Sequence, residues 1–172
     1  MKNQPSAITQ DALIGSLERL IKKKSFENIS VSELTKVAGI SRMTFYRHYH
    51  NSIDILNLGV QELLNKFNQT IKYSGDNYAY ILKVVTFFQQ HSKFIKLLLN
   101  TNQQDLLYQN ASIIIGELAH MNNYLNGLND QEKHYYIEYH TTGLMSVIID
   151  WIKNDQVESP TKLAKFIDYN SR

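Results

Sequence analysis

Four side chains on the outer face of one predicted helix are suited to binding a nucleic acid. At about 100° per residue, Met43 and Arg47 lie farthest from the apolar Phe45. Thr44 and Tyr46 lie on the flanks of that outer face. The face therefore combines a guanidinium, a thioether, a hydroxyl and a phenol. This combination is typical of a recognition helix, whose first residues meet base edges while cationic and aromatic flanks meet phosphates.

Two short helices joined by a tight turn are predicted to position these side chains. Ser30 and Glu33 have the spacing of a capping box, which begins the first helix. Gly39 stands where a left-handed residue ends it, and Ser41 is an N-cap for the second helix, residues 42–49. The buried side of the first helix carries Val31, Leu34, Val37 and Ala38. By itself, the pattern also fits an ordinary amphipathic helix pair with a solvated face.

A third helix completes the predicted head. Residues 9–24 carry an apolar stripe and are expected to pack across the helix-turn-helix pair. Phe45 and Tyr49 lie four residues apart, so they share a face that holds the second helix onto the first. Residues 1–50 contain eight Lys or Arg against four Asp or Glu, whereas the remainder contains ten against twelve. A basic head on a slightly acidic body favours separate DNA-facing and solvent-facing roles.

The stretch FENISVSELTKVAGISRMTFYRHYHNSIDIL resembles the DNA-binding domain of the TetR/AcrR family of bacterial transcriptional regulators. The resemblance covers about residues 9–56, and the string TFYRHY is its most specific part. It implies that Tyr46 and His48 hold DNA phosphates. It further implies base or backbone contacts from Arg42, Met43, Thr44 and Arg47.

One position departs from the family pattern. The family usually has a lysine where this chain has Ser52, and an acidic residue where it has Ile53. A serine donates a hydrogen bond to a phosphate but brings no charge. The full set of candidate DNA contacts, with the two N-cap serines included, is Ser30, Ser41, Arg42, Met43, Thr44, Tyr46, Arg47, His48 and Ser52.

Composition narrows the class of protein. The chain has 172 residues, of which 43% are hydrophobic and 20% charged, with two prolines, so it is a folded helical protein rather than a disordered one. It lacks cysteine, which excludes disulfides and thiolate metal sites. Residues 1–10 have no signal-peptide core, and no run of about 18 apolar residues occurs. We expect a cytoplasmic protein without membrane contact.

The rest of the chain is predicted to be helical too. Apolar stripes indicate helices over residues 51–73, 78–90, 94–99, 105–124, 130–154 and 159–169. The predicted fold is all-α, with a DNA-binding head in residues 1–50 and a helical effector-binding and dimerisation domain in residues 51–172. Because the helix over residues 51–73 is uninterrupted, it is expected to connect the two domains.

The last two helices offer more apolar surface than one small domain hides, which favours a homodimer. Gly143, inside the first of them, is expected to allow a close helix crossing. In the TetR-like family the equivalent pair forms a four-helix bundle with a second subunit. The strings GLM, DWIKN and ESPTKLA resemble a subgroup that includes regulators near dihydroxyacetone kinase genes. Candidate interface residues are Tyr136, His140, Gly143, Val147, Trp151, Leu163 and Phe166.

Aromatic side chains in this domain suggest a pocket for a small-molecule effector. Tyrosine combines an apolar ring with a hydroxyl for a ligand, although any one of them is equally an ordinary core aromatic. A ligand bound here is expected to change DNA affinity by moving the helix over residues 51–73. Candidate effector contacts are Phe67, Tyr78, Phe87, Phe88, Tyr108 and Tyr139.

Other functions have weaker support. His134 and Glu138 lie four residues apart, with His140 and His120 as further donors, but no dense metal motif accompanies them, so neither metal nor cofactor is expected. No nucleophile stands at a recognisable spacing from a base, so we do not expect an enzyme. The alternative to an effector-controlled regulator is a helical protein-interaction adaptor or coactivator that binds no effector.

Overall fold

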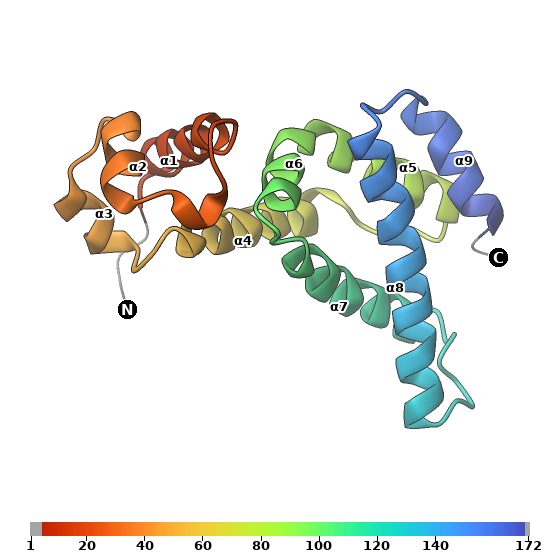
Figure 1. Ribbon diagram of the computed structural model, residues 1–172. Coiled ribbons are helices and arrows are strands. Elements are labelled where there is room, and N and C mark those ends of the chain that lie inside the picture. Colours follow the sequence, from red (N-terminus) through yellow and green to blue (C-terminus); the bar gives the residue numbers. More distant parts are fainter. Residues whose placement is uncertain (1–4, 171–172) are drawn as a thin grey trace. The chain divides into compact units, whose positions relative to one another are not determined.

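The computed structural model describes residues 5–170. Within this range every regular element is helical and no strand occurs, which confirms the all-α prediction (Figure 1). The expectation about a signal sequence falls partly on residues 1–4, which lie outside the described range. In the described residues no helix is both long and apolar enough to cross a membrane. The elements are α1 (Ala7–Leu20), a short 3-10 helix η1 (Phe26–Asn28), α2 (Val31–Ala38), α3 (Arg42–His48), α4 (Ile53–Thr70), α5 (Asn77–Gln90), α6 (Ser92–Asn100), α7 (Asp105–Met121), α8 (Asp130–Lys153) and α9 (Pro160–Asn170).

Helix α1 begins and ends earlier than its apolar stripe predicts. Ser6 is the N-cap, because its hydroxyl accepts the amide hydrogen of Thr9 at 3.2 Å. Residues 21–24 form a turn rather than a last helical turn, and the amide of Lys23 donates to the Leu20 carbonyl oxygen. The turn brings Lys24 to the start of α2, where its ammonium group pairs with the Glu33 carboxylate.

Helices α4 and α7 end earlier than predicted, whereas Asn51 caps the start of α4 as predicted. Asn51 lies outside α4, and its Oδ1 accepts the amide hydrogen of Asp54 at 3.2 Å. Helix α4 ends at Thr70 rather than at residue 73. Helix α7 ends at Met121 rather than at residue 124, since Asn123 adopts a left-handed conformation with φ of 61°.

The described chain folds into two compact units. The first contains the described residues up to Asn65 together with Leu97–Gln103. Its core is built where α1, α2 and α3 pack together. Side chains fully buried in it include Leu13, Leu17, Leu34, Phe45, Tyr49, Ile55 and Leu56. The division of function at residues 50 and 51 stays a prediction.

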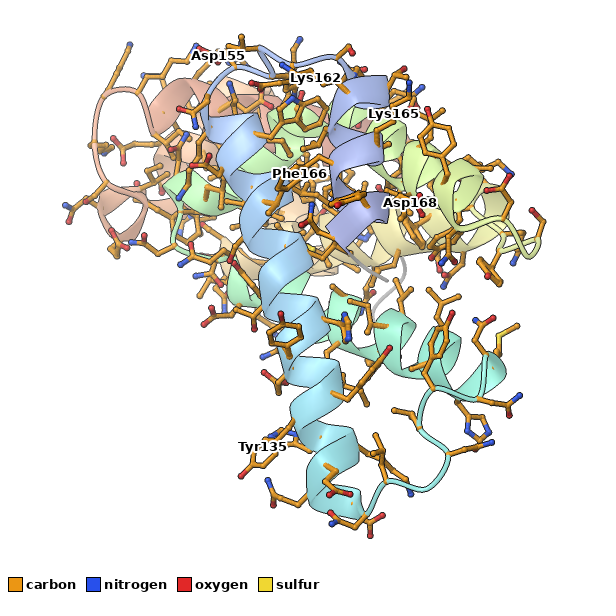
Figure 2. All side chains as sticks on the ribbon, turned by 90° about the vertical axis from the view of Figure 1, so that its right-hand side faces the viewer. Tyr135, Asp155, Lys162, Lys165, Phe166 and Asp168 are labelled. Atoms are coloured by element: carbon orange, nitrogen blue, oxygen red, sulfur yellow. The ribbon has the colours of Figure 1, made fainter. Side chains whose placement is uncertain are left out.

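The second unit contains Lys66–Lys96 and the described residues from Gln104 onward. In it α9 packs on α5, and α7 packs against α8 (Figure 1). Figure 2 shows α8 and α9 nearest the viewer, with Tyr135 on α8 and Phe166 on α9. Buried side chains of this unit include Val85, Met145, Ile148, Ile152 and Ala164.

The close helix approach inside this unit lies at Gly116 and not at Gly143. A β-carbon at position 116 would lie 3.3 Å from Ile137 Cδ1, so the missing side chain lets α7 and α8 come together. A β-carbon at position 143 would meet no heavy atom within 4 Å. Within one chain, therefore, the helix contact predicted at Gly143 is made elsewhere.

Candidate nucleic-acid interface and ligand cavity

A three-residue turn sets the angle between α2 and α3. Gly39 has φ of 69°, a left-handed conformation that a side chain would strain. The amide of Ile40 donates to the Thr35 carbonyl oxygen at 3.1 Å, which closes the end of α2. Ser41 then begins α3, and its hydroxyl accepts the Thr44 amide hydrogen at 3.0 Å. The predicted turn and both of its caps are confirmed.

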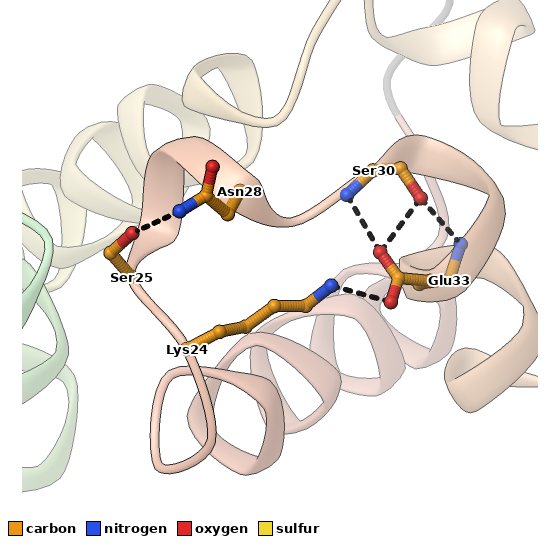
Figure 3. A network of polar contacts seen from close by, with 5 residues as sticks. All are labelled: Lys24, Ser25, Asn28, Ser30 and Glu33. Carbon is orange, nitrogen blue, oxygen red and sulfur yellow. Dashed lines mark hydrogen bonds and ion pairs between the residues drawn. The ribbon is translucent and has the colours of Figure 1, made fainter.

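The start of α2 is fixed by a network around Glu33 (Figure 3). The Ser30 amide and hydroxyl donate to Glu33 Oε2 at 3.1 and 2.8 Å, and the Glu33 amide donates back to Ser30 Oγ at 3.3 Å. This is the predicted capping box. Lys24 Nζ donates to Glu33 Oε1 at 2.5 Å. The hydrogen bond from Lys24, followed by those from Ser30, lowers the pKa of Glu33 to about 2.

The network has a consequence for Ser30 as a DNA contact. Its hydroxyl hydrogen points to Glu33, so it is already used inside the head. In the same way the Ser41 and Thr44 hydroxyls pair at 2.9 Å. These three side chains therefore support helix ends, and contact with a phosphate would require their hydroxyls to exchange partners.

The inner face of α3 is anchored by two fully buried aromatic side chains. Phe45 and Tyr49 have no exposed surface, and their ring centroids lie 5.2 Å apart. The Tyr49 phenol donates to Gln10 Oε1, while Gln10 Nε2 donates to the Ile55 carbonyl oxygen at 3.0 Å. Burial raises the pKa of the Tyr49 phenol, as does the Glu62 carboxylate, so the group stays a donor. Gln10 was not among the residues that the sequence singled out.

The outer face of α3 is open, as predicted. Met43 is 76% exposed and Tyr46 44%, and both arginines of the helix are exposed. The Arg42 guanidinium carbon lies 6.0 Å from the centroid of the Tyr46 ring. His48 is half-buried, as is Ser52 just before α4. Helix α3 contains no acidic residue, so its exposed face is cationic.

The second unit contains a cavity of about 380 Å³ between α5, α7, α8 and α9. Of the predicted effector contacts, only Tyr139 lines it. Five predicted interface residues line it instead: Tyr136, His140, Gly143, Val147 and Phe166. The tyrosines Tyr73, Tyr80 and Tyr124 also line it.

The other predicted effector contacts lie elsewhere in the structure. Phe87 lines a separate hollow beside Lys66, Lys83 and His91, and its ring packs on that of Phe67 at 5.3 Å. The pKa of His91 is lowered by burial and by the Lys66 ammonium. The remaining three predicted contacts line neither hollow: Tyr78, Phe88 and Tyr108.

Two predicted interface residues belong to the core of the second unit. Trp151 is 3% exposed, and its Nε1 donates to the Glu158 carbonyl oxygen at 2.9 Å. Leu163 is 8% exposed. These side chains complete the fold of a single chain because they pack inward from α8 and α9. The large exposed aromatics of the two helices are Tyr135, Tyr139, Phe166 and Tyr169.

Comparison with known proteins decides the family. A family model described as "Transcriptional regulator C-terminal region", of the TetR type, matches residues 76–170, more than half of the chain. The chain belongs to the TetR family. It is therefore a transcriptional regulator rather than an enzyme, and the helix-turn-helix in its head is the DNA-binding element of that family.

Individual relatives agree with this assignment. The chain is 26% identical over 115 residues to the HTH-type dhaKLM operon transcriptional activator DhaS of Lactococcus lactis subsp. lactis (strain IL1403). The match covers 67% of this chain and 54% of DhaS, so the chain spans about half the length of that relative.

Solved structures show the same fold. Lin0861 from Listeria innocua has a TM-score of 0.71 at 18% identity, covering 96% of this chain and 90% of that one. The fatty acid degradation regulator FadR from Bacillus halodurans has a TM-score of 0.64 at 19% identity, covering 96% and 94%. At these low identities, the two similarities show that the chain shares the fold of these proteins.

The histidines of this TetR-family chain are not gathered at one point. Among the described residues, no group of three or more His, Asp or Glu side chains is placed to share a metal ion. His140 packs on Tyr136 with ring centroids 4.2 Å apart, and burial lowers its pKa. His134 and Glu138 are exposed on α8.

Proposed function

We propose that this TetR-family regulator binds an operator in the cytoplasm as a homodimer, and that a small molecule in the second unit adjusts its DNA affinity. The observation that carries the proposal is the contrast between the two faces of α3. Phe45 and Tyr49 fix the inner face, while Arg42, Met43 and Arg47 stand exposed on a face without acidic residues. A rigid helix with a cationic outer face fits the major groove.

The candidate contacts have different proposed roles. Arg42 and Arg47 bind base edges or phosphates, and Tyr46 and His48 hold phosphates on the flank. Met43 and Thr44 lie against the bases from the first turn of α3. The half-buried Ser52 adds a neutral phosphate contact at the start of α4. The N-cap serines Ser30 and Ser41 act mainly by fixing the helix ends.

Dimerisation is proposed through the exposed face of α8 and α9. Family members commonly form dimers. Tyr139 on α8 is 77% exposed and Phe166 on α9 is 57% exposed. Figure 2 shows these two helices side by side. Because a two-fold axis relates the heads, the operator is an inverted repeat whose half-sites lie about 34 Å apart or a multiple of that distance.

The cavity between α5, α7, α8 and α9 is the proposed effector site. Tyr73, which lines it, stands three residues after the end of α4, and α4 supplies residues to both units. A ligand that favours one position of Tyr73 therefore acts on α4. A coupling of about 1–3 kcal/mol would change operator affinity roughly 5- to 150-fold.

Control of an operon is the proposed biological role. The name of DhaS describes activation of the dhaKLM operon, and this chain is similar to DhaS over 115 residues. Selection of genomic fragments against excess competitor DNA tests the proposal. A regulator retains a specific duplex containing an inverted repeat, whereas an adaptor that binds only protein retains none. Sedimentation at micromolar concentration should then give a species of twice 20.0 kDa, and a 20.0 kDa species alone contradicts the dimer.

A further inference from the structure

The cavity in the second unit is lined without a formal charge. Its walls include no Asp, Glu, Lys or Arg side chain among the described residues. Its polar groups are phenols, carboxamides and one imidazole. Burial lowers the pKa of His140, and burial raises the pKa of Tyr80 to about 12. The imidazole is therefore neutral and the phenol protonated at neutral pH.

Aromatic rings form much of the lining. Tyr73 and Tyr80 meet edge to face, with centroids 5.6 Å apart. Tyr136 packs on His140 at 4.2 Å and on Tyr124 at 6.5 Å. The first pair comes from α5 and the segment before it, and the second group from α8 and the segment after α7. Flat rings from both sides of the cavity favour a planar aromatic guest.

Three carboxamides line the cavity, and the Asn77 oxygen already accepts from the Tyr73 hydroxyl at 3.0 Å. Asn122 Nδ2 donates to the Leu118 carbonyl oxygen at 2.8 Å, and Asn170 Nδ2 donates to the Phe166 carbonyl oxygen at 2.7 Å. Within residues 5–170, the Oδ1 atoms of these two amides accept no hydrogen bond. A guest with a hydroxyl or N–H group can donate to either of these two oxygens.

We propose that this cavity binds an uncharged planar aromatic compound that carries a hydrogen-bond donor, which deepens the effector role proposed above and rests on it. An anion meets no cation among the described lining residues. A cation gains from the aromatic rings of the lining but has no carboxylate to replace the water it loses. A neutral hydroxylated ring satisfies the Asn122 and Asn170 oxygens without that loss.

Three probes of matched shape test the charge preference by calorimetry on the full chain. They are 2-naphthol, 2-naphthoate and 2-naphthylmethylammonium. The neutral probe should bind at least about tenfold more tightly than either ion. Equal affinity, tighter binding of an ion, or no binding of any probe up to its solubility limit overturns the proposal.

Variants place the binding in this cavity. Gly143→Leu adds a side chain to the wall at a position with no heavy atom within 4 Å, and it should abolish naphthol binding while melting is unchanged or higher. Asn122→Asp should transfer the preference to the ammonium probe, because it adds the absent carboxylate. Phe88→Leu, which alters an aromatic outside the cavity, is the matched control and should leave affinity unchanged. Naphthol binding that survives both cavity variants places the ligand elsewhere and contradicts the inference.

Operator binding separates this inference from the function on which it rests. If naphthol binds with the predicted charge preference and shifts operator affinity, the proposed ligand class and the proposed effector role are both supported. If it binds in that way but saturating operator leaves its affinity unchanged, the ligand class stands and the effector role fails, since coupling is reciprocal.

Discussion

The phenol of Tyr49 donates its hydrogen bond to the side chain of Gln10, which lies 39 residues earlier in the chain. The same amide donates from Nε2 to the Ile55 carbonyl oxygen at 3.0 Å. Gln10 has no exposed surface. One buried side chain of α1 thus joins the end of the recognition helix to the first turn of α4, so these three elements hold a fixed arrangement within the head.

Replacing Gln10 should destabilise the head. Gln10→Leu leaves the Tyr49 hydroxyl and the Ile55 carbonyl oxygen buried without this partner, at a cost of about 1–3 kcal/mol. Urea unfolding measures the loss. Tyr49→Phe and the double variant complete a cycle, in which the two losses should sum to more than the double variant shows. Strict additivity would mean that the two side chains do not interact.

The bridge from Lys24 to Glu33 should contribute stability that depends on pH. The pKa of Glu33 in the folded chain is about 2, below the ordinary value of 4.5. Its contribution is therefore complete above pH 4.5 and is lost as pH falls through 2. Glu33→Gln should lower the urea midpoint at neutral pH, and the difference from the parent should shrink between pH 4.5 and 2. Glu27→Gln, on η1, is the control. A difference that persists unchanged at the acid end would contradict the assigned cause.

One buried hydroxyl of α8 should be dispensable. Thr141 is 2% exposed, and its Oγ1 has no hydrogen-bond partner in the described structure. Thr141→Val keeps the shape and removes the unpaired group, so it should stabilise the chain by about 1 kcal/mol. Thr35→Val is the matched control, because Thr35 is also buried but donates to the Val31 carbonyl oxygen at 2.8 Å. Thermal unfolding should rise for the first variant and not for the second.

Two helical glycines should respond differently to alanine. Gly143→Ala places a methyl group in open space and should gain about 0.5–1 kcal/mol from helix propensity. Gly116→Ala places one 3.3 Å from Ile137 Cδ1, so packing offsets the gain and the variant should be less stable than Gly143→Ala. Sedimentation of Gly143→Ala adds a second test: a weakened dimer would show that two chains approach closely at this position.

Local chemistry made the head predictable from sequence. The Ser30 and Ser41 caps and the left-handed Gly39 depend on neighbours three or four residues away, and the structure confirms all three. The burial of Phe45 and Tyr49 follows from helical spacing. The role of Gln10 could not be predicted because its partners lie 39 and 45 residues away in the sequence. A glutamine within a predicted helix also gives no indication that it is buried.

The second unit was less predictable because its packing depends on how helices are oriented. Aromatic type alone selected Phe67 and Phe88, whereas the cavity is lined by tyrosines from different helices, such as Tyr80 on α5 and Tyr136 on α8. Trp151 and the exposed Tyr139 lie on the same helix, and periodicity alone does not show which face turns inward. Packing of α9 on α5 and of α7 on α8 decides that.

Binding of the operator to the outer face of α3 can be measured by fluorescence anisotropy. A selected operator duplex is titrated at several salt concentrations with the parent chain, Arg42→Ala and Arg47→Ala. Lys93→Ala, which removes a cation from α6, is the control and should bind as the parent does. An arginine bound to a phosphate should lower the salt slope by about 1 when removed, and one bound to guanine should cost about 1–3 kcal/mol of discrimination at one base pair. If both arginine variants bound the operator as tightly as the parent chain, with the same salt slope, α3 would not be the reading helix.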